Sequence, residues 1–197
     1  MRNVIQLMLL SLAVFGLPAI AGAATVWDGP DVLFSKDSSQ PTTVQDVLTP
    51  DVSLTRGTSG ILFNPLGGDV GAGAGTPSGT LWAFDTDIGN PTDADFNAAN
   101  FAALTFLPFL DAVGGSRGDG GPGVPNVILG TGGVLHLVAE DVYLDIEFLT
   151  WTNVAGNPGA AVSYLRSSPT VIPLPAALPM AATGLALLGY RGRRHRA

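Results

Sequence analysis

Short runs in which apolar and polar residues alternate dominate the chain between residues 24 and 168. The clearest run covers residues 142–148, where an extended chain would place four apolar side chains on one face and three polar ones on the other. The apolar set is Val142, Leu144, Ile146 and Phe148, and the polar set is Tyr143, Asp145 and Glu147. A strand of this kind covers a core with one face and meets water with the other, which is typical of an antiparallel sheet.

Shorter runs of the same kind are separated by glycine, proline and polar residues. They predict further strands at 32–34, 52–55, 61–63, 81–84, 134–138 and 161–166. Residues 96–109 predict a helical turn that runs into a strand and stops at Pro108, and the glycine-rich segments 67–79 and 114–125 predict loops. We therefore expect one all-β domain at 24–170, an antiparallel β-sandwich with a jelly-roll-like order of strands.

The first 23 residues have the three parts of a secretory signal peptide. Arg2 supplies the positive charge, residues 7–17 are apolar, and the small residues Ala21 and Ala23 flank Gly22 at the end. This pattern predicts a signal helix at 1–23 and cleavage before Ala24. An uncleaved amino-terminal anchor is the alternative, although the apolar run is short for a membrane span.

The last 27 residues, 171–197, combine a proline motif, an apolar segment and a basic end. As a helix, the apolar residues 176–190 would extend about 22 Å, which is less than the roughly 30 Å of a bilayer's hydrocarbon layer. They predict a short transmembrane helix whose basic flank stays in the cytoplasm, so that the acidic domain faces outward. The basic flank consists of Arg191, Arg193, Arg194 and Arg196.

This tail resembles the PEP-CTERM sorting signal in its VPLPA form, because an apolar helix and a basic end follow the motif Ile172, Pro173, Leu174, Pro175 and Ala176. The resemblance implies processing by an exosortase-type membrane enzyme, a Gram-negative envelope and an association with exopolysaccharide. Leu174 replaces the acidic residue of the name-giving Pro-Glu-Pro, which implies a variant sortase subtype. A plain single-span anchor is the alternative reading of the tail.

The domain itself is similar to uncharacterised exported domains that carry such tails. The residues behind this similarity are 136–138, 141–146 with Trp151, and 163–167. The similarity assigns no catalytic residues to the domain.

Charge and composition narrow the chemistry of the domain. Segment 24–170 holds 16 acidic and four basic residues, a formal charge of −12, which disfavours a nucleic-acid partner. The chain has no cysteine, which excludes disulfides, thiolate nucleophiles and cysteine-ligated metals. His136 is the only histidine of this segment, so it cannot form a histidine-rich metal site, and a serine–histidine–aspartate triad would have to pass through this residue.

Two binding sites can be predicted from the remaining polar and aromatic residues. Carboxylates close together in a loop suit Ca²⁺, and the loop after residue 84 offers Asp85, Asp87, Asp93 and Asp95; solvated loop acids are the alternative. Aromatic faces beside a carboxylate suit sugar rings, and Tyr143, Asp145 and Trp151 would form such a patch if they shared the outward face. Core packing is the alternative for the tryptophan.

Asp145 and Glu147 could also be the carboxylate pair of a glycosidase, but acids on one strand face are usually a solvated surface. We therefore expect a non-catalytic protein with a structural or adhesive role. It would be anchored in the inner membrane facing the periplasm and then released to the cell surface or the extracellular matrix. A carbohydrate- or calcium-binding module is the alternative, and a polysaccharide hydrolase has the least support.

Overall fold

The computed structural model of the chain describes residues 23–71, 75–85, 96–115, 120–152 and 160–170. Most of the predicted signal peptide, including Ala21, and the whole predicted sorting segment 171–197 lie outside these residues. Within the described segments, no helix is long and apolar enough to cross a membrane. The described residues form a mostly β fold with a few short helices, which confirms the prediction that the domain is built mainly from strands.

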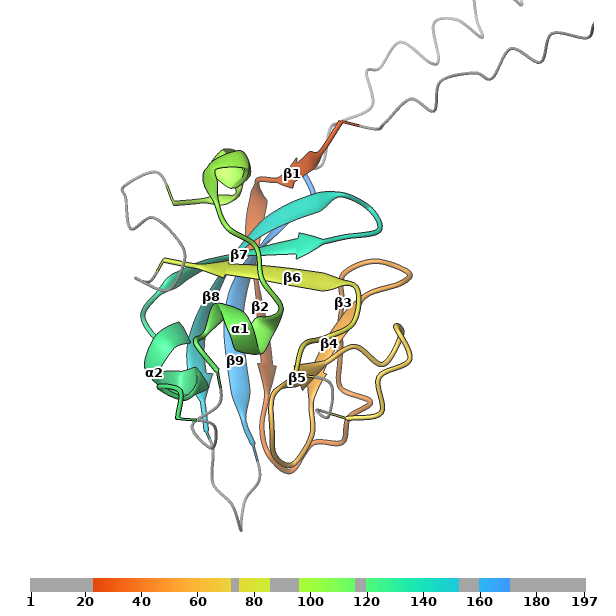
Figure 1. Cartoon of the computed structure of the whole chain (residues 1–197). Coiled ribbons are helices and arrows are strands. Elements are labelled where there is room, and N and C mark those ends of the chain that lie inside the picture. The colour runs from red at the N-terminus through yellow and green to blue at the C-terminus, as the bar shows by residue number, and fades with distance from the viewer. Residues whose placement is uncertain (1–22, 72–74, 86–95, 116–119, 153–159, 171–197) are drawn as a thin grey trace, which may run out of the picture.

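The fold is built on a six-stranded sheet (Figure 1). Five strands lie in the order β2, β9, β8, β7, β6, and every neighbouring pair along this path is antiparallel. The sixth, β1 (Thr25–Trp27), runs parallel to the start of β8. The other bounds are β2 (Gly29–Lys36), β6 (Thr80–Phe84), β7 (Gly132–Leu137), β8 (Val142–Trp151) and β9 (Val162–Ser168).

The two ends of the described domain meet at one corner of this sheet. The hydroxyl of Thr170 donates a hydrogen bond to the carboxylate of Asp28. Next to this bond, a Cβ on Gly29 would lie 2.7 Å from the carbonyl oxygens of Ser168 and Pro169, so only glycine fits there. The chain therefore enters and leaves the domain side by side.

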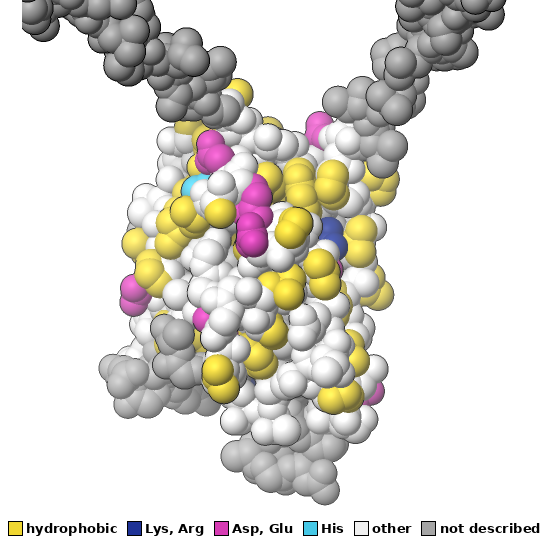
Figure 2. Space-filling view, turned by 90° about the vertical axis from the view of Figure 1, so that its right-hand side faces the viewer, with side chains coloured by type: hydrophobic (Ala, Val, Ile, Leu, Met, Phe, Trp, Pro, Cys, Tyr) yellow, Lys and Arg dark blue, Asp and Glu magenta, His cyan; other side chains and the backbone are white. Residues whose placement is uncertain are grey.

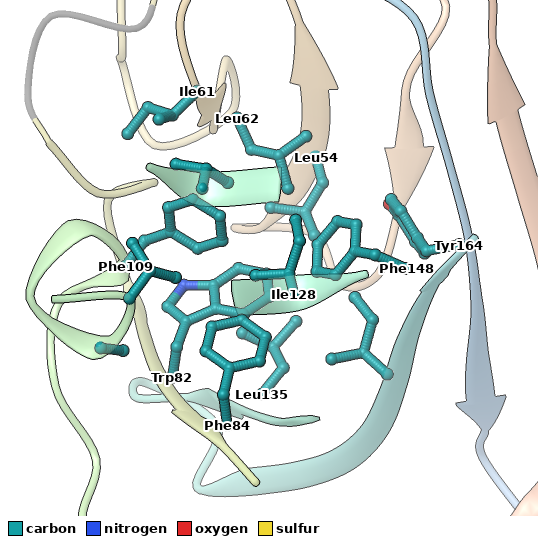
Figure 3. Close-up of a cluster of buried hydrophobic side chains, with 14 of the residues drawn as sticks. Leu54, Ile61, Leu62, Trp82, Phe84, Phe109, Ile128, Leu135, Phe148 and Tyr164 are labelled. Carbon is teal, nitrogen blue, oxygen red and sulfur yellow. The ribbon is translucent and has the colours of Figure 1, made fainter. Parts of the chain in front are cut away.

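A second, three-stranded sheet and two short helices close the main core against one face of the large sheet. This sheet has the order β3 (Asp46–Val47), β4 (Ser53–Arg56), β5 (Leu62–Phe63), and the helices are α1 (Phe109–Ala112) and α2 (Val124–Ile128). Figure 3 shows Trp82 among the rings of the core. Its ring meets Phe109 edge-on at 5.0 Å, and its indole nitrogen donates to Thr80 Oγ1 at 2.9 Å. The apolar set predicted for one face of β8 lies in this core: Val142, Leu144, Ile146 and Phe148.

A buried ion pair joins the two sheets. Arg166 on β9 donates from Nε and Nη2 to the two carboxylate oxygens of Asp46 on β3, at 2.7 and 2.8 Å. The phenol of Tyr164, also on β9, donates to the same carboxylate at 3.1 Å. A planar guanidinium matches a carboxylate in this two-pronged way, so the pair fixes how β3 lies over the large sheet.

The opposite face of the large sheet is covered in part by the 3₁₀ helix η2 (Ala98–Ala103), which the side chain of Asn97 caps by accepting from Ala99 N at 3.0 Å. Beneath it lies a second apolar cluster of Ala98, Val134 and Tyr143, flanked by Ala24, Val26, Phe96, Phe101, Leu104 and Phe106. The prediction that the polar face of β8 meets water is therefore wrong at Tyr143, which is 9% exposed.

Other predictions failed where elements are very short. Residues 104–106 are described and form no strand; only Leu107 bridges to Trp82, and α1 begins directly after Pro108. Helix α2 starts at Val124, inside the segment predicted to be a glycine-rich loop. Helices of four or five residues are below the length at which hydrophobic periodicity can be recognised.

Candidate functional site

A groove of about 210 Å³ lies beside η2, on the part of this sheet face that the helix does not cover. Three of its residues carry carboxylates, two have large apolar side chains that face the groove, and two are glycines. It is lined by Asp31, Phe96, Gly132, Gly133, Asp145, Ile146, Glu147, Leu165, Arg166 and Ser167. A concave site with apolar walls and a few polar groups is the usual form of a ligand-binding site.

Strand register explains why these residues meet. Gly132 on β7 lies opposite Glu147 on β8, Glu147 opposite Leu165 on β9, and Leu165 opposite Leu33 on β2. Because alternate residues of a strand share a face, Asp145 joins Glu147 on this side of β8. The groove thus runs across four adjacent strands, and no single segment of the sequence contains it.

Gly132 keeps the groove open above β7. A Cβ added to this residue would meet no atom within 4 Å, whereas a Cβ on the neighbouring Gly133 would lie 2.8 Å from the ring of Phe84 on the core side. Any side chain at position 132 would therefore stand in the groove. The backbone at Gly132 does not require glycine, because its φ lies outside the left-handed region.

Asp145 is the most constrained carboxylate of the groove. Its Oδ1 accepts a hydrogen bond from the backbone amide of Ala98 at 2.8 Å, and its own amide donates to Ser167 Oγ at 2.9 Å. Partial burial raises the pKa of the Asp145 carboxyl, and the negative charge of Asp31 raises it further, although the bond from Ala98 opposes this shift. Asp31 and Glu147 are exposed.

The groove is acidic throughout. Among the described residues that line it, Arg166 is the basic one, and its guanidinium is bonded to Asp46 between the two sheets. One side of the molecule, drawn in Figure 2, shows the same imbalance on a larger scale, since acidic groups lie among hydrophobic ones and basic groups are scarce.

The predicted carbohydrate patch of Tyr143, Asp145 and Trp151 is not formed, because only Asp145 lies in the groove. The register shifts between Phe148 and Thr150, and such a bulge reverses the alternation of faces beyond it. Trp151 consequently points into the main core, 6% exposed, with the guanidinium of Arg56 3.8 Å from its ring centre.

Tyr143 is packed between two rings under η2. Phe101 stacks on it at 3.9 Å and His136 at 4.2 Å. Burial raises the pKa of the Tyr143 phenol, and the adjacent Asp141 carboxylate raises it further. The imidazole Nε2 of His136 lies 3.2 Å from Asp141 Oδ1, so this cluster fastens the turn between β7 and β8.

The predicted calcium loop is described only at its first residue. Asp85 follows β6, and its amide donates to the carbonyl of Gly132 at 2.9 Å. Asp87, Asp93 and Asp95 lie outside the described residues. Across the described segments, no three histidine or acidic side chains come together as metal ligands.

No protein-family model, curated protein or solved structure matches this chain. The function of the groove is therefore inferred from the residues that line it. The alternating pattern of β8 placed Asp145 and Glu147 on one face, but Asp31, Phe96 and Gly132 could not be assigned to the same site without the strand register, which the sequence alone does not show.

Proposed function

We propose that the chain is an exported envelope protein whose β domain is displayed outside the inner membrane and whose tail is a sorting segment. The observation that carries the proposal is that the carboxyl end of the domain returns to its amino end just before the motif. Strand β9 stops at Ser168, and Thr170 bonds back to Asp28 only two residues before the motif begins at Ile172.

The proposed role of the displayed domain is structural or adhesive, in the matrix or at the cell surface. In this proposal the two packed sheets form a jelly-roll-like sandwich, and the groove on the large sheet faces the extracellular medium. The amino and carboxyl ends of the domain lie together at one corner of the sheet. An adhesive role needs a binding surface, and the groove on the large sheet offers one. Glycan binding is the second candidate function for this reason.

The intact mass of the mature protein, purified from its native host, tests the sorting proposal. A mass that starts at Ala24 and lacks everything beyond residues 173–176 is the expected result. A mass that includes the complete tail would contradict processing and favour a permanent anchor. If the exosortase-type enzyme recognises the proline motif, replacement of both Pro173 and Pro175 by alanine should prevent cleavage, and the mature protein should keep its tail.

A further inference from the structure

The groove holds three carboxylates that the described fold does not neutralise. The Asp145 carboxylate accepts from the backbone amide of Ala98, and the guanidinium of Arg166 is bonded to Asp46 on the other side of the sheet. Asp31 and Asp145 repel one another, which is part of why the pKa of Asp145 is raised. A ligand that brings a positive charge would relieve this repulsion.

The dimensions of the groove favour a ligand larger than an ion. Asp145 on β8 and Asp31 on β2 are separated by β9, so their strands lie about 10 Å apart, whereas a calcium ion needs all its oxygen ligands at about 2.3–2.6 Å. The volume of about 210 Å³ is below that of the pockets that hold drug-sized molecules. A single ring with polar substituents is the scale of ligand that fits.

The walls of the groove favour a sugar over a peptide. Phe96 and Leu165 offer apolar surface on which the C–H face of a sugar ring can pack, and carboxylates accept hydrogen bonds from hydroxyl and ammonium groups. A peptide commonly binds a sheet by adding a strand at its edge. Here β8 and β9 are already paired on both sides, so a peptide in the groove could add a strand only at β2, on the edge of the sheet and away from Asp145 and Glu147.

We infer that this groove binds an amino-sugar unit of a polysaccharide, with the protonated amine at Asp145 and Glu147, a ring hydroxyl donating to Asp31, and the ring against Phe96 and Leu165. The inference rests on the proposed function only in that the domain must face extracellular polymers. It makes Gly132 a residue that keeps the site open and Glu147 a direct ligand contact. In the adhesive role, the ligand of the domain would then be an amino-sugar polymer.

Calorimetric titration of the full-length chain, purified in a detergent without a sugar headgroup, tests the inference. The probes are a glucosamine tetrasaccharide, its fully N-acetylated counterpart, calcium chloride, and a lysine–leucine peptide. We expect the glucosamine oligomer to bind at least about tenfold more tightly than the acetylated one, because acetylation removes the charge. Equal binding of both sugars, no sugar binding, or saturable binding of only calcium or only the peptide would overturn the inference.

Two variants locate the site, and a third controls for charge. Glu147→Gln removes one exposed carboxylate and should weaken binding about tenfold, and Gly132→Leu fills the groove without changing its charge and should abolish binding. Asp111→Asn removes an exposed acid on α1, outside the groove, and should leave binding unchanged. Unchanged affinity in Gly132→Leu, with a melting temperature like that of wild type, would refute the location. The mass measurement above is independent, so the sorting proposal and this inference can fail separately.

Discussion

The ion pair between Asp46 and Arg166 makes the sharpest prediction about how the two sheets are held together. Both side chains are 8% exposed, and the carboxylate accepts from two guanidinium nitrogens and from the phenol of Tyr164. Replacement of Asp46 by alanine removes all three acceptor interactions. The buried guanidinium of Arg166 and the buried phenol of Tyr164 then lose the carboxylate to which they donate.

The expected loss follows from the burial of the charge that remains. Breaking a buried pair by removal of one partner costs about 3–5 kcal/mol, because the other charge keeps its desolvation penalty. A domain of this size is stable by roughly 7–20 kcal/mol, so Asp46→Ala should fold with a much lower urea midpoint. Replacing the pair by apolar residues, Asp46→Leu with Arg166→Met, should recover most of the loss, because no charge is then left buried.

Urea unfolding of the wild type, of Asp46→Leu and Arg166→Met alone, and of the double variant completes a thermodynamic cycle, and Asp46→Ala is measured beside it. Asp111→Ala, an exposed acid, is the control and should change the free energy of unfolding by less than about 0.5 kcal/mol. A loss below about 1 kcal/mol in Asp46→Ala, or simple additivity in the double variant, would show that the pair does not couple the sheets.

Two further substitutions test the groove and the corner where the chain ends meet. Because the folded pKa of Asp145 is raised above the ordinary value of 3.8, wild-type stability should fall as pH rises from about that value through the folded pKa. Asp145→Asn keeps an oxygen that can accept from the Ala98 amide but has no carboxyl group to ionise, so its stability should not fall in this way and should exceed that of the wild type by up to about 1 kcal/mol at pH 7. Urea midpoints measured from pH 3 to 7 test this expectation. A steeper loss of stability in the variant than in the wild type would contradict the raised pKa of Asp145. Gly29→Ala should destabilise by about 1–3 kcal/mol in thermal melts, because its Cβ would lie 2.7 Å from the Ser168 carbonyl oxygen. Gly57→Ala is the control and should not lower the melting temperature, because a Cβ on Gly57 would have its nearest contact at an ordinary 3.7 Å. Equal melting temperatures of the two variants would show that the backbone at Gly29 does not approach residues 168 and 169 closely.

The sequence predicted those features that depend on local alternation. The two faces of β8 are recognisable from residues 142–148, and the apolar set does lie in the main core. Local alternation could not reveal the bulge between Phe148 and Thr150, which turns Trp151 from the outward face into the core. One extra residue in one strand changes the face of every residue beyond it, and no composition signal marks the position.

The sequence also could not show which strands are neighbours. Asp31 and Asp145 are more than a hundred residues apart, and they share a groove only because β2 and β8 both pair with β9. Likewise, β1 has three residues and pairs in parallel with β8, in a domain where antiparallel pairs were expected. Short strands in a nonlocal arrangement carry too little pattern to be assigned without their partners.

The groove treats charge differently from the contact between the two sheets. There Arg166 is paired with Asp46, whereas the groove gathers the carboxylates of Asp31, Asp145 and Glu147, and the one cation among the described residues that line it, Arg166, is bonded to Asp46. Packing does not require this arrangement, since an amide at position 145 would hold Ala98 equally well and would remove the repulsion from Asp31. Unfavourable local electrostatics that the fold could avoid are characteristic of residues retained for binding. A cationic ligand in the groove would offset the repulsion between Asp31 and Asp145.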